Sequence, residues 1–241
     1  MATIFVEDAN FFGSAYKVAR QLGFECSNLT QMLTTDRLQL IYTSKRLALL
    51  EPESQNLLYP KYPEITSPDR SCFPLLKSLG RSNDSSVILD LTAGFGRDSF
   101  IMASFGYQVY SIEKSPMVAA FLCDKILKET SQQEQMVWQC MLADSHEVLD
   151  HYPIKWPSPD IVYMDPMFPE NAFKAKVKQT SRLLQDLAET RPLEGVVKPA
   201  LALARKRVVV KRAKKDNFLD QVKPDYQLKF SRCRFDVYIT T

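Results

Sequence analysis

A short apolar run in the second half of the chain ends in groups suited to binding a planar base. The run Asp160–Met164 is followed by Asp165 and Pro166 and, two residues later, by Phe168. Asp165 and the Pro166 carbonyl can each accept a hydrogen bond from an exocyclic amine, and the ring of Phe168 can stack on the base. Asp-Pro is also common in ordinary turns after a strand, so the motif alone leaves both interpretations open.

A loop that contains two glycines is the second candidate site. Gly94 and Gly96 lie between an apolar run and a segment with a helical pattern. Glycine has no side chain, so the backbone at these positions can approach a ligand closely. Asp90 precedes the loop and Asp98 follows it. Each carboxylate has a structural alternative, because Asp90 can fix the loop and Asp98 can favour a helix N-terminus electrostatically.

Acidic residues also end the next two expected strands. Glu113 lies about 20 residues beyond the loop, where an acidic side chain can accept hydrogen bonds from ribose hydroxyls. Asp144 can accept a hydrogen bond from the adenine amine, or it can cap a short helix that begins at Ser145. These positions suit a nicotinamide dinucleotide or S-adenosylmethionine. Asp90 and Asp98 would repel a pyrophosphate, so the charges favour S-adenosylmethionine, which presents an ammonium and a sulfonium.

The elements that must position these residues alternate between strand and helix from residue 87 onward. Strands are expected at 87–91, 108–112, 137–142, 160–164 and 207–211, and helices at about 97–105, 116–129 and 174–190. This alternation predicts an α/β fold with a mostly parallel, doubly wound sheet whose ligands bind at the carboxyl ends of the strands. Segments 227–230 and 235–240 are expected to form an antiparallel pair at the sheet edge.

The first 74 residues predict a small N-terminal α/β layer, which a proline-rich connector joins to a larger domain at 75–241. The expected elements of this layer are a strand at 3–6, a helix at 11–22 that ends near Gly23, and a hairpin of 38–42 with 46–50. The connector carries five prolines between residues 51 and 74, which favours a linker or loop.

Composition excludes several classes of protein. The five cysteines form no Cys-x-x-Cys pair and there are only two histidines, so no metal site is expected. Scattered cysteines are typical of reduced thiols in the cytoplasm. No apolar run reaches the roughly 18 residues of a membrane span, and the N-terminus lacks the layout of a signal peptide. These patterns predict a soluble, cytoplasmic protein with no membrane partner.

Four segments in order resemble the RsmJ family, the bacterial small-subunit (16S) ribosomal RNA guanine-N2 methyltransferases. They are 88–100, 162–169, 207–212 and 234–238. The resemblance implies a Rossmann-like class I methyltransferase fold and a cytoplasmic location. It implies transfer of a methyl group from S-adenosylmethionine to guanine 1516 of the RNA, either naked or in a pre-subunit particle. The S-adenosylmethionine site that it implies consists of Arg97, Asp98, Glu113, Lys114, Asp144, Ser145 and Asp165.

Basic side chains gather at 205–215, although the net charge of the whole chain is only +3. We expect Lys211 and Arg212 to contact RNA phosphates; the alternative is a solvated charged face. Other functions stay open at this point. An amino-methyltransferase for adenine in DNA or RNA would use the same acid and aromatic ring. An NAD-dependent oxidoreductase and a non-catalytic RNA-binding protein are the alternatives from other classes.

Overall fold

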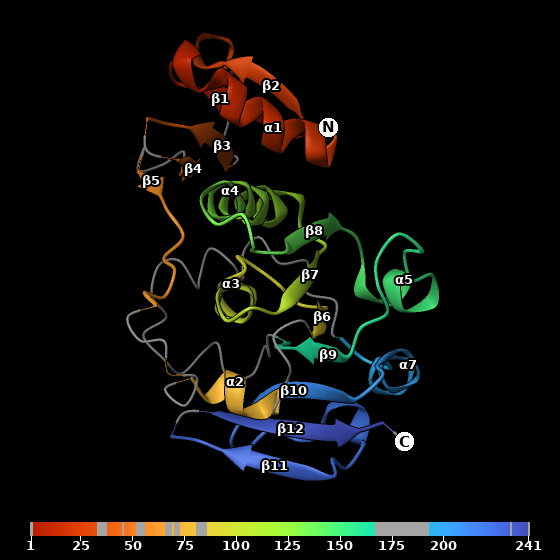
Figure 1. Ribbon diagram of the computed structural model, residues 1–241. Coiled ribbons are helices and arrows are strands. Elements are labelled where there is room, and N and C mark those ends of the chain that lie inside the picture. Colours follow the sequence, from red (N-terminus) through yellow and green to blue (C-terminus); the bar gives the residue numbers. More distant parts are fainter. Residues whose placement is uncertain are drawn as a thin grey trace.

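The computed structural model describes residues 2–32, 38–44, 46–51, 56–65, 69, 73–80, 86–166, 193–231 and 233–240. These residues form a five-stranded sheet near the N-terminus and a seven-stranded sheet that follows it (Figure 1). The expected helix at 174–190 lies outside the described residues.

The larger sheet has the order β11-β12-β10-β9-β6-β7-β8. Its strands are β6 (Val87–Asp90), β7 (Gln108–Glu113), β8 (Trp138–Leu142), β9 (Ile161–Met164), β10 (Arg207–Ala213), β11 (Tyr226–Lys229) and β12 (Cys233–Ile239). The five strands from β6 to β10 run parallel, and β12 runs antiparallel to both β10 and β11. The predicted mostly parallel sheet and its C-terminal antiparallel pair are therefore confirmed.

Helices cover both faces of this sheet. On one face lie α2 (Pro74–Ser78), α3 (Arg97–Ser104) and α4 (Pro116–Gln132), and on the other lie α5 (Ser145–Asp150) and α7 (Val197–Leu203). The alternating strand residues divide accordingly. Ile88 and Tyr163 pack in the core on the α3 and α4 side, whereas Leu89 and Val162 pack in the core on the α5 and α7 side. Near-continuous apolar strands buried on both faces are typical of parallel sheets. The predicted doubly wound Rossmann-like fold is confirmed.

The smaller sheet has the order β2-β1-β3-β4-β5. Its elements are β1 (Thr3–Val6), α1 (Phe12–Leu22), β2 (Glu25–Asn28), β3 (Gln39–Tyr42), β4 (Leu47–Leu50) and β5 (Leu57–Leu58). Helix α1 ends at Gly23, which has φ 68°. The predicted helix and the β3–β4 hairpin are confirmed, whereas β2 and β5 were not expected. Three 3₁₀ turns complete the described elements, at Ala9–Phe11, Leu29–Gln31 and Leu219–Gln221.

Helix α4 lies between the two sheets (Figure 1) and shares one hydrophobic core with the N-terminal layer. In this core Val18 of α1 and Leu47 of β4 pack with Phe121 of α4. The Tyr42 hydroxyl also donates a 2.8 Å hydrogen bond to Asp124 of α4. The predicted boundary between residues 74 and 75 falls at the start of α2 and stays a prediction.

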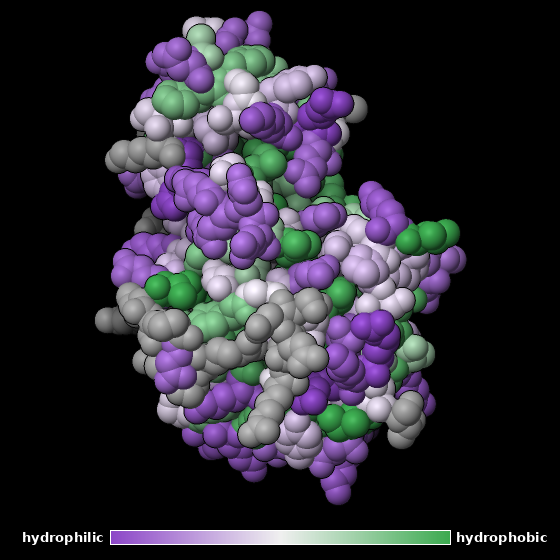
Figure 2. Space-filling view, viewed as in Figure 1, coloured by the Kyte–Doolittle hydropathy of each residue, from purple (hydrophilic) through white to green (hydrophobic). Residues whose placement is uncertain are grey.

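The face shown in Figure 2 is mainly hydrophilic, and its hydrophobic groups form small separate patches. Among the described residues the exposed large hydrophobic side chains are Tyr16, Leu57, Ile154, Tyr226 and Ile239. These residues come from different parts of the chain. No helix of the described residues is long and apolar enough to cross a lipid bilayer.

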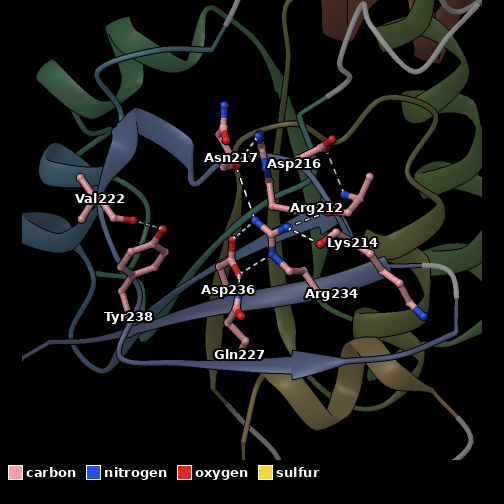
Figure 3. Close-up of polar contacts among 10 residues, drawn as sticks. Arg212, Lys214, Asp216, Asn217, Val222, Gln227, Arg234, Asp236 and Tyr238 are labelled. Atoms are coloured by element: carbon pink, nitrogen blue, oxygen red, sulfur yellow. Dashed lines mark hydrogen bonds and ion pairs between the residues drawn. The ribbon is translucent and has the colours of Figure 1, made fainter.

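A buried arginine of β12, paired with an aspartate of the same strand, connects β12 to the turn that follows β10 (Figure 3). Arg234 is 3% exposed and Asp236 is 0% exposed, and Arg234 Nε donates to Asp236 Oδ1 at 2.9 Å. Arg234 also donates to the carbonyls of Ala213 and Lys214, each at 2.9 Å. Burying a charged side chain is very costly unless the charge is paired and hydrogen-bonded, as it is for both residues here. Arg234, held by Asp236, therefore fixes the turn at the end of β10.

The variant Arg234→Met leaves Asp236 buried without its cation and removes the donor from two carbonyls. We expect the free energy of unfolding, measured by urea denaturation, to fall by about 3–5 kcal/mol. The control Arg234→Met/Asp236→Leu removes both charges and should regain part of that loss. If the double variant were no more stable than the single one, the unpaired charge would not be the cause.

Candidate active site

The candidate site lies at the carboxyl edge of the central strands, where one lysine joins two carboxylates. Val210 of β10 pairs with Met164 of β9, so the next residues, Lys211 and Asp165, lie side by side at the strand ends. Lys211 Nζ donates to Asp165 Oδ2 and to Asp98 Oδ2, each at 2.8 Å. Asp98 comes from the first turn of α3. The sheet register and a helix start therefore bring together residues that are far apart in the sequence.

Electrostatics keep Lys211 charged and affect Asp165 in both directions. Burial alone would lower the pKa of Lys211, but the carboxylates of Asp165 and Asp98 raise it above its ordinary value. Burial raises the pKa of Asp165, Lys211 opposes that rise and Asp98 adds to it. The Asp165 side chain is still 40% exposed, so it can be reached from outside the protein.

Two further side chains hold these carboxylates in place. The Tyr163 hydroxyl donates to Asp98 Oδ2 at 2.5 Å, and burial together with Asp98 raises the pKa of Tyr163 well above its ordinary value. The hydroxyl therefore stays protonated and acts as a donor. Thr92 Oγ1 accepts a hydrogen bond from the backbone N–H of Asp165 at 2.6 Å. Neither Tyr163 nor Thr92 was predicted as a site residue, although Tyr163 lies in the strand before Asp165 and Thr92 in the glycine loop.

The two loop glycines have different roles. Both have positive φ, 55° at Gly94 and 80° at Gly96, a conformation that favours glycine. A Cβ added at Gly94 would meet nothing within 4 Å, so the backbone there faces open space. A Cβ at Gly96 would lie 2.5 Å from Leu122 and 2.8 Å from Trp138. The close approach to a ligand that was predicted for both glycines therefore fits Gly94, whereas Gly96 is required for packing.

Glu113 ends β7 beside the glycine loop. Its Oε2 accepts a hydrogen bond from the Gly94 N–H at 2.9 Å, and its Oε1 accepts one from the Ser115 N–H at 2.8 Å. Burial raises the pKa of Glu113, whereas these backbone donors and the nearby Lys114 lower it. A carboxylate can accept several hydrogen bonds, so Glu113 retains capacity for ribose hydroxyls.

Asp144 and Ser145 lie at the end of β8. Asp144 caps α5, because its Oδ1 accepts from the His146 N–H at 2.8 Å. Burial alone would raise the pKa of Asp144, but the hydrogen bonds from His146 lower it. Ser145 Oγ donates to the Leu91 carbonyl at 2.5 Å and so joins this end of β8 to the glycine loop. Asp144 therefore has the capping role named as its structural alternative, and binding to adenine stays a prediction.

Two predicted cofactor residues have other contacts in the structure. Asp90 is 1% exposed, and its oxygens accept from the Thr92 N–H at 3.0 Å and from Ser99 Oγ at 2.5 Å. Burial raises its pKa to about 7. The buried side chain therefore fixes the loop, which is the structural alternative named for it, and binding of the cofactor by Asp90 stays a prediction. Arg97 is exposed, and its Nε donates to the Lys61 carbonyl of the connector at 2.8 Å.

The basic pair predicted to contact RNA does not lie on an exposed surface. Lys211 is bound to the site carboxylates, and Arg212 is 6% exposed and donates to the Asn217 carbonyl at 2.6 Å. Strand alternation turns these neighbours to opposite faces of β10, and both faces are covered. Both side chains make their hydrogen bonds within the protein, and their contacts with RNA phosphates stay a prediction. Pro166 is buried beside Asp165, and Phe168 lies outside the described residues.

The donor set fits S-adenosylmethionine. The open side of Gly94 lies next to Glu113, and a cationic ligand there would be near the carboxylates of Asp98 and Asp165, which share only one lysine. A diphosphate would meet the same negative charge unfavourably. Among the described residues no group of three or more His, Cys, Asp or Glu side chains is arranged to hold a metal ion.

Comparisons with known proteins identify the family of this chain. A family model described as a putative SAM-dependent methyltransferase matches residues 26–240. The ribosomal RNA small subunit methyltransferase J of Nitrosococcus oceani is 33% identical and the alignment covers 94% of each chain. The protein of the same name from Pseudoalteromonas atlantica is 41% identical over 68% of this chain and 67% of its own.

A solved SAM-dependent methyltransferase from Neisseria gonorrhoeae has the same fold. Its TM-score is 0.67 at 23% identity, over 99% of this chain and 96% of that one. The family match also decides between the two cofactors that the sequence left open. The cofactor of this family is S-adenosylmethionine and not a nicotinamide dinucleotide. The chain belongs to the family of SAM-dependent methyltransferases that includes the ribosomal RNA small subunit methyltransferase J proteins.

Proposed function

We propose that this protein methylates the exocyclic N2 of a guanine in small-subunit ribosomal RNA, with guanine 1516 as the target. The relatives' names support small-subunit ribosomal RNA as the substrate. The observation that carries the proposal is the partly exposed Asp165 carboxylate, which Lys211 holds at the sheet edge beside the glycine loop. The predicted cytoplasmic location belongs to the same proposal.

Positioning is the main task of these residues. S-adenosylmethionine supplies an activated methyl group when it is bound. The guanine amine is a poor nucleophile because its lone pair is delocalised into the ring. Lys211 holds Oδ2 of Asp165, so we assign Oδ1 to the amine, with the Pro166 carbonyl as the second acceptor. Holding the reactants in line can supply roughly 7–11 kcal/mol of the barrier.

The charge of the cluster also suits the reaction. The amine becomes positive as it gains the methyl group, and two carboxylates with one ammonium leave a local net charge of −1 beside it. Fixed charges of this kind stabilise a transition state in which the opposite charge develops. Asp165 or a water molecule then accepts the proton that the amine loses.

Access to this acceptor requires a base outside its stack. The substrate guanine must come from a single-stranded element or be flipped out of a helix. We propose that Phe168 stacks on the base. Stacking of a base on an aromatic side chain contributes about 1–3 kcal/mol. An adenine amine would satisfy the same acceptors, so adenine N6 methylation is the alternative outcome of the experiment below.

The direct test is incubation of the protein with labelled S-adenosylmethionine and small-subunit RNA from a strain that lacks this gene. Mapping the label should find one guanine, methylated at N2. Naked RNA and the assembled subunit are tested as parallel substrates. Label on adenine, or no transfer to either substrate, would contradict the proposal.

The variant Asp165→Asn keeps the shape of the side chain but removes the charged acceptor. We expect kcat to fall by about 10²–10³-fold, as when one group that stabilises a transition state is removed. Cofactor binding, measured by calorimetry, should change little.

The matched control for that variant is Glu113→Gln, which changes the same chemical group on the cofactor side. It should weaken cofactor binding and raise the KM for S-adenosylmethionine more than it lowers kcat. Near wild-type turnover by Asp165→Asn would remove Asp165 from the mechanism.

The variant Lys211→Met leaves Asp98 and Asp165 without their shared cation. Because Lys211 lowers the pKa of Asp165, its loss should raise that pKa and move the acid limb of the kcat–pH profile upward by about 1–3 units. Activity near neutral pH should therefore fall and partly recover in alkaline buffer. Lys211→Arg retains the charge and should keep the limb near its wild-type position. An unmoved limb combined with weaker RNA binding would instead return Lys211 to the phosphate-contact role.

A further inference from the structure

The far half of the large sheet presents a basic surface at the same edge as the candidate site. Lys214 and Lys215 form the turn directly after β10, and Lys229 ends β11. All three side chains are exposed. Arg212 and Lys229 both pair with Arg234 of β12, so Lys229 lies at the level of the end of β10. We name Lys214, Lys215 and Lys229 the basic edge.

The turn that carries two of these lysines is held from inside the protein. Arg234, which is itself bound to Asp236, donates to the carbonyls of Ala213 and Lys214 (Figure 3). Figure 3 shows the Lys214 side chain extending away from this network. A fixed backbone means that less conformational freedom is lost when the lysines bind a partner.

Asp216, the acidic residue of this turn, hydrogen-bonds with Ala213. Asp216 Oδ2 accepts a hydrogen bond from the Ala213 N–H at 3.2 Å, and the Asp216 N–H donates to the Ala213 carbonyl at 3.2 Å. Asp216 therefore closes the turn through both its side chain and its backbone. Among the described residues no ion pair involves Lys214, Lys215 or Lys229. These ammonium groups are available to an anionic partner.

The sheet order indicates which partner this is. The candidate cofactor residues lie at the ends of β6, β7 and β8, and Asp165 lies at the end of β9. The basic edge lies on the other side of Asp165, at β10 and β11. A nucleotide whose base reaches Asp165 must continue into neighbouring phosphates, and lysines bind phosphates with little dependence on sequence.

We propose that the basic edge binds the phosphate backbone of the substrate RNA next to the methylated nucleotide. This inference rests on the proposed function. Lys211 and Arg212 use their side chains in contacts within the protein, so the phosphate contacts are assigned instead to Lys214 and Lys215, in the turn after the same strand, and to Lys229 at the end of β11. The basic edge positions RNA and leaves the chemistry to the Asp165 cluster.

The test compares two double variants that lose the same charge. Lys214→Gln/Lys215→Gln removes two lysines of the basic edge. The control Lys128→Gln/Lys155→Gln removes two exposed lysines from the opposite edge, near the end of α4 and before β9. Affinity for unmethylated small-subunit RNA is measured across a potassium chloride series, together with cofactor affinity and turnover.

The basic-edge variant should bind RNA roughly tenfold more weakly, and its plot of log affinity against log salt should become shallower by about 1.4, which corresponds to two phosphate contacts on a single strand. Cofactor affinity and kcat at saturating RNA should stay at wild-type values, and the control should match wild type throughout. A basic-edge variant with the wild-type salt slope would overturn the inference. Failure of the proposed function is a separate result, because it would show as absence of methyl transfer by the wild-type protein.

Discussion

The candidate site depends on one shared cation. Lys211 contacts Asp98 and Asp165 at equal distances, and without it two carboxylates would face each other at the mouth of the sheet. A nearby like charge disfavours ionisation of a carboxylate, and burial together with Asp98 raises the pKa of Asp165. Lys211 opposes that rise and so favours the ionised form of Asp165, whose side chain is partly exposed. Tyr163 and Thr92 then limit the positions that the two acids can take.

The parallel sheet makes this cluster possible because it aligns strand ends that are distant in sequence. Asp165 follows β9, Lys211 ends the apolar part of β10, and Asp98 begins α3 after β6. The same edge continues to Glu113 and Asp144 at the ends of β7 and β8. The candidate cofactor residues therefore lie on one side of β9, and the residues proposed to bind RNA lie on the other. Both sets are at the carboxyl edge of the strands, where open α/β sheets bind their ligands.

Much of this arrangement was predictable from periodicity, because buried parallel strands and their helices have strong sequence patterns. The Asp165 motif and the Gly94 loop were found by this route. Side-chain partners were not predictable, because they depend on register. Nothing in the sequence distinguishes a buried Asp90 that binds Ser99 from one that faces a ligand. Nor does local sequence show that the acceptors of Lys211 come from two other elements.

The basic run at 205–215 shows why register decides function. In the sequence it resembles one charged face, yet its members lie in different environments. Arg207 donates to the Tyr226 hydroxyl of β11 at 3.2 Å. Arg205 and Lys206 bind Asp160 at the edge of the sheet opposite the site. Lys211 serves the site carboxylates, Arg212 is buried, and Lys214 with Lys215 faces solvent. Each residue of an extended strand advances about 3.3 Å and reverses its face, so the seven residues of β10 carry the run from one edge of the sheet to the other. The charge of such a run therefore does not identify a binding surface until the position of each of its residues in the fold is known.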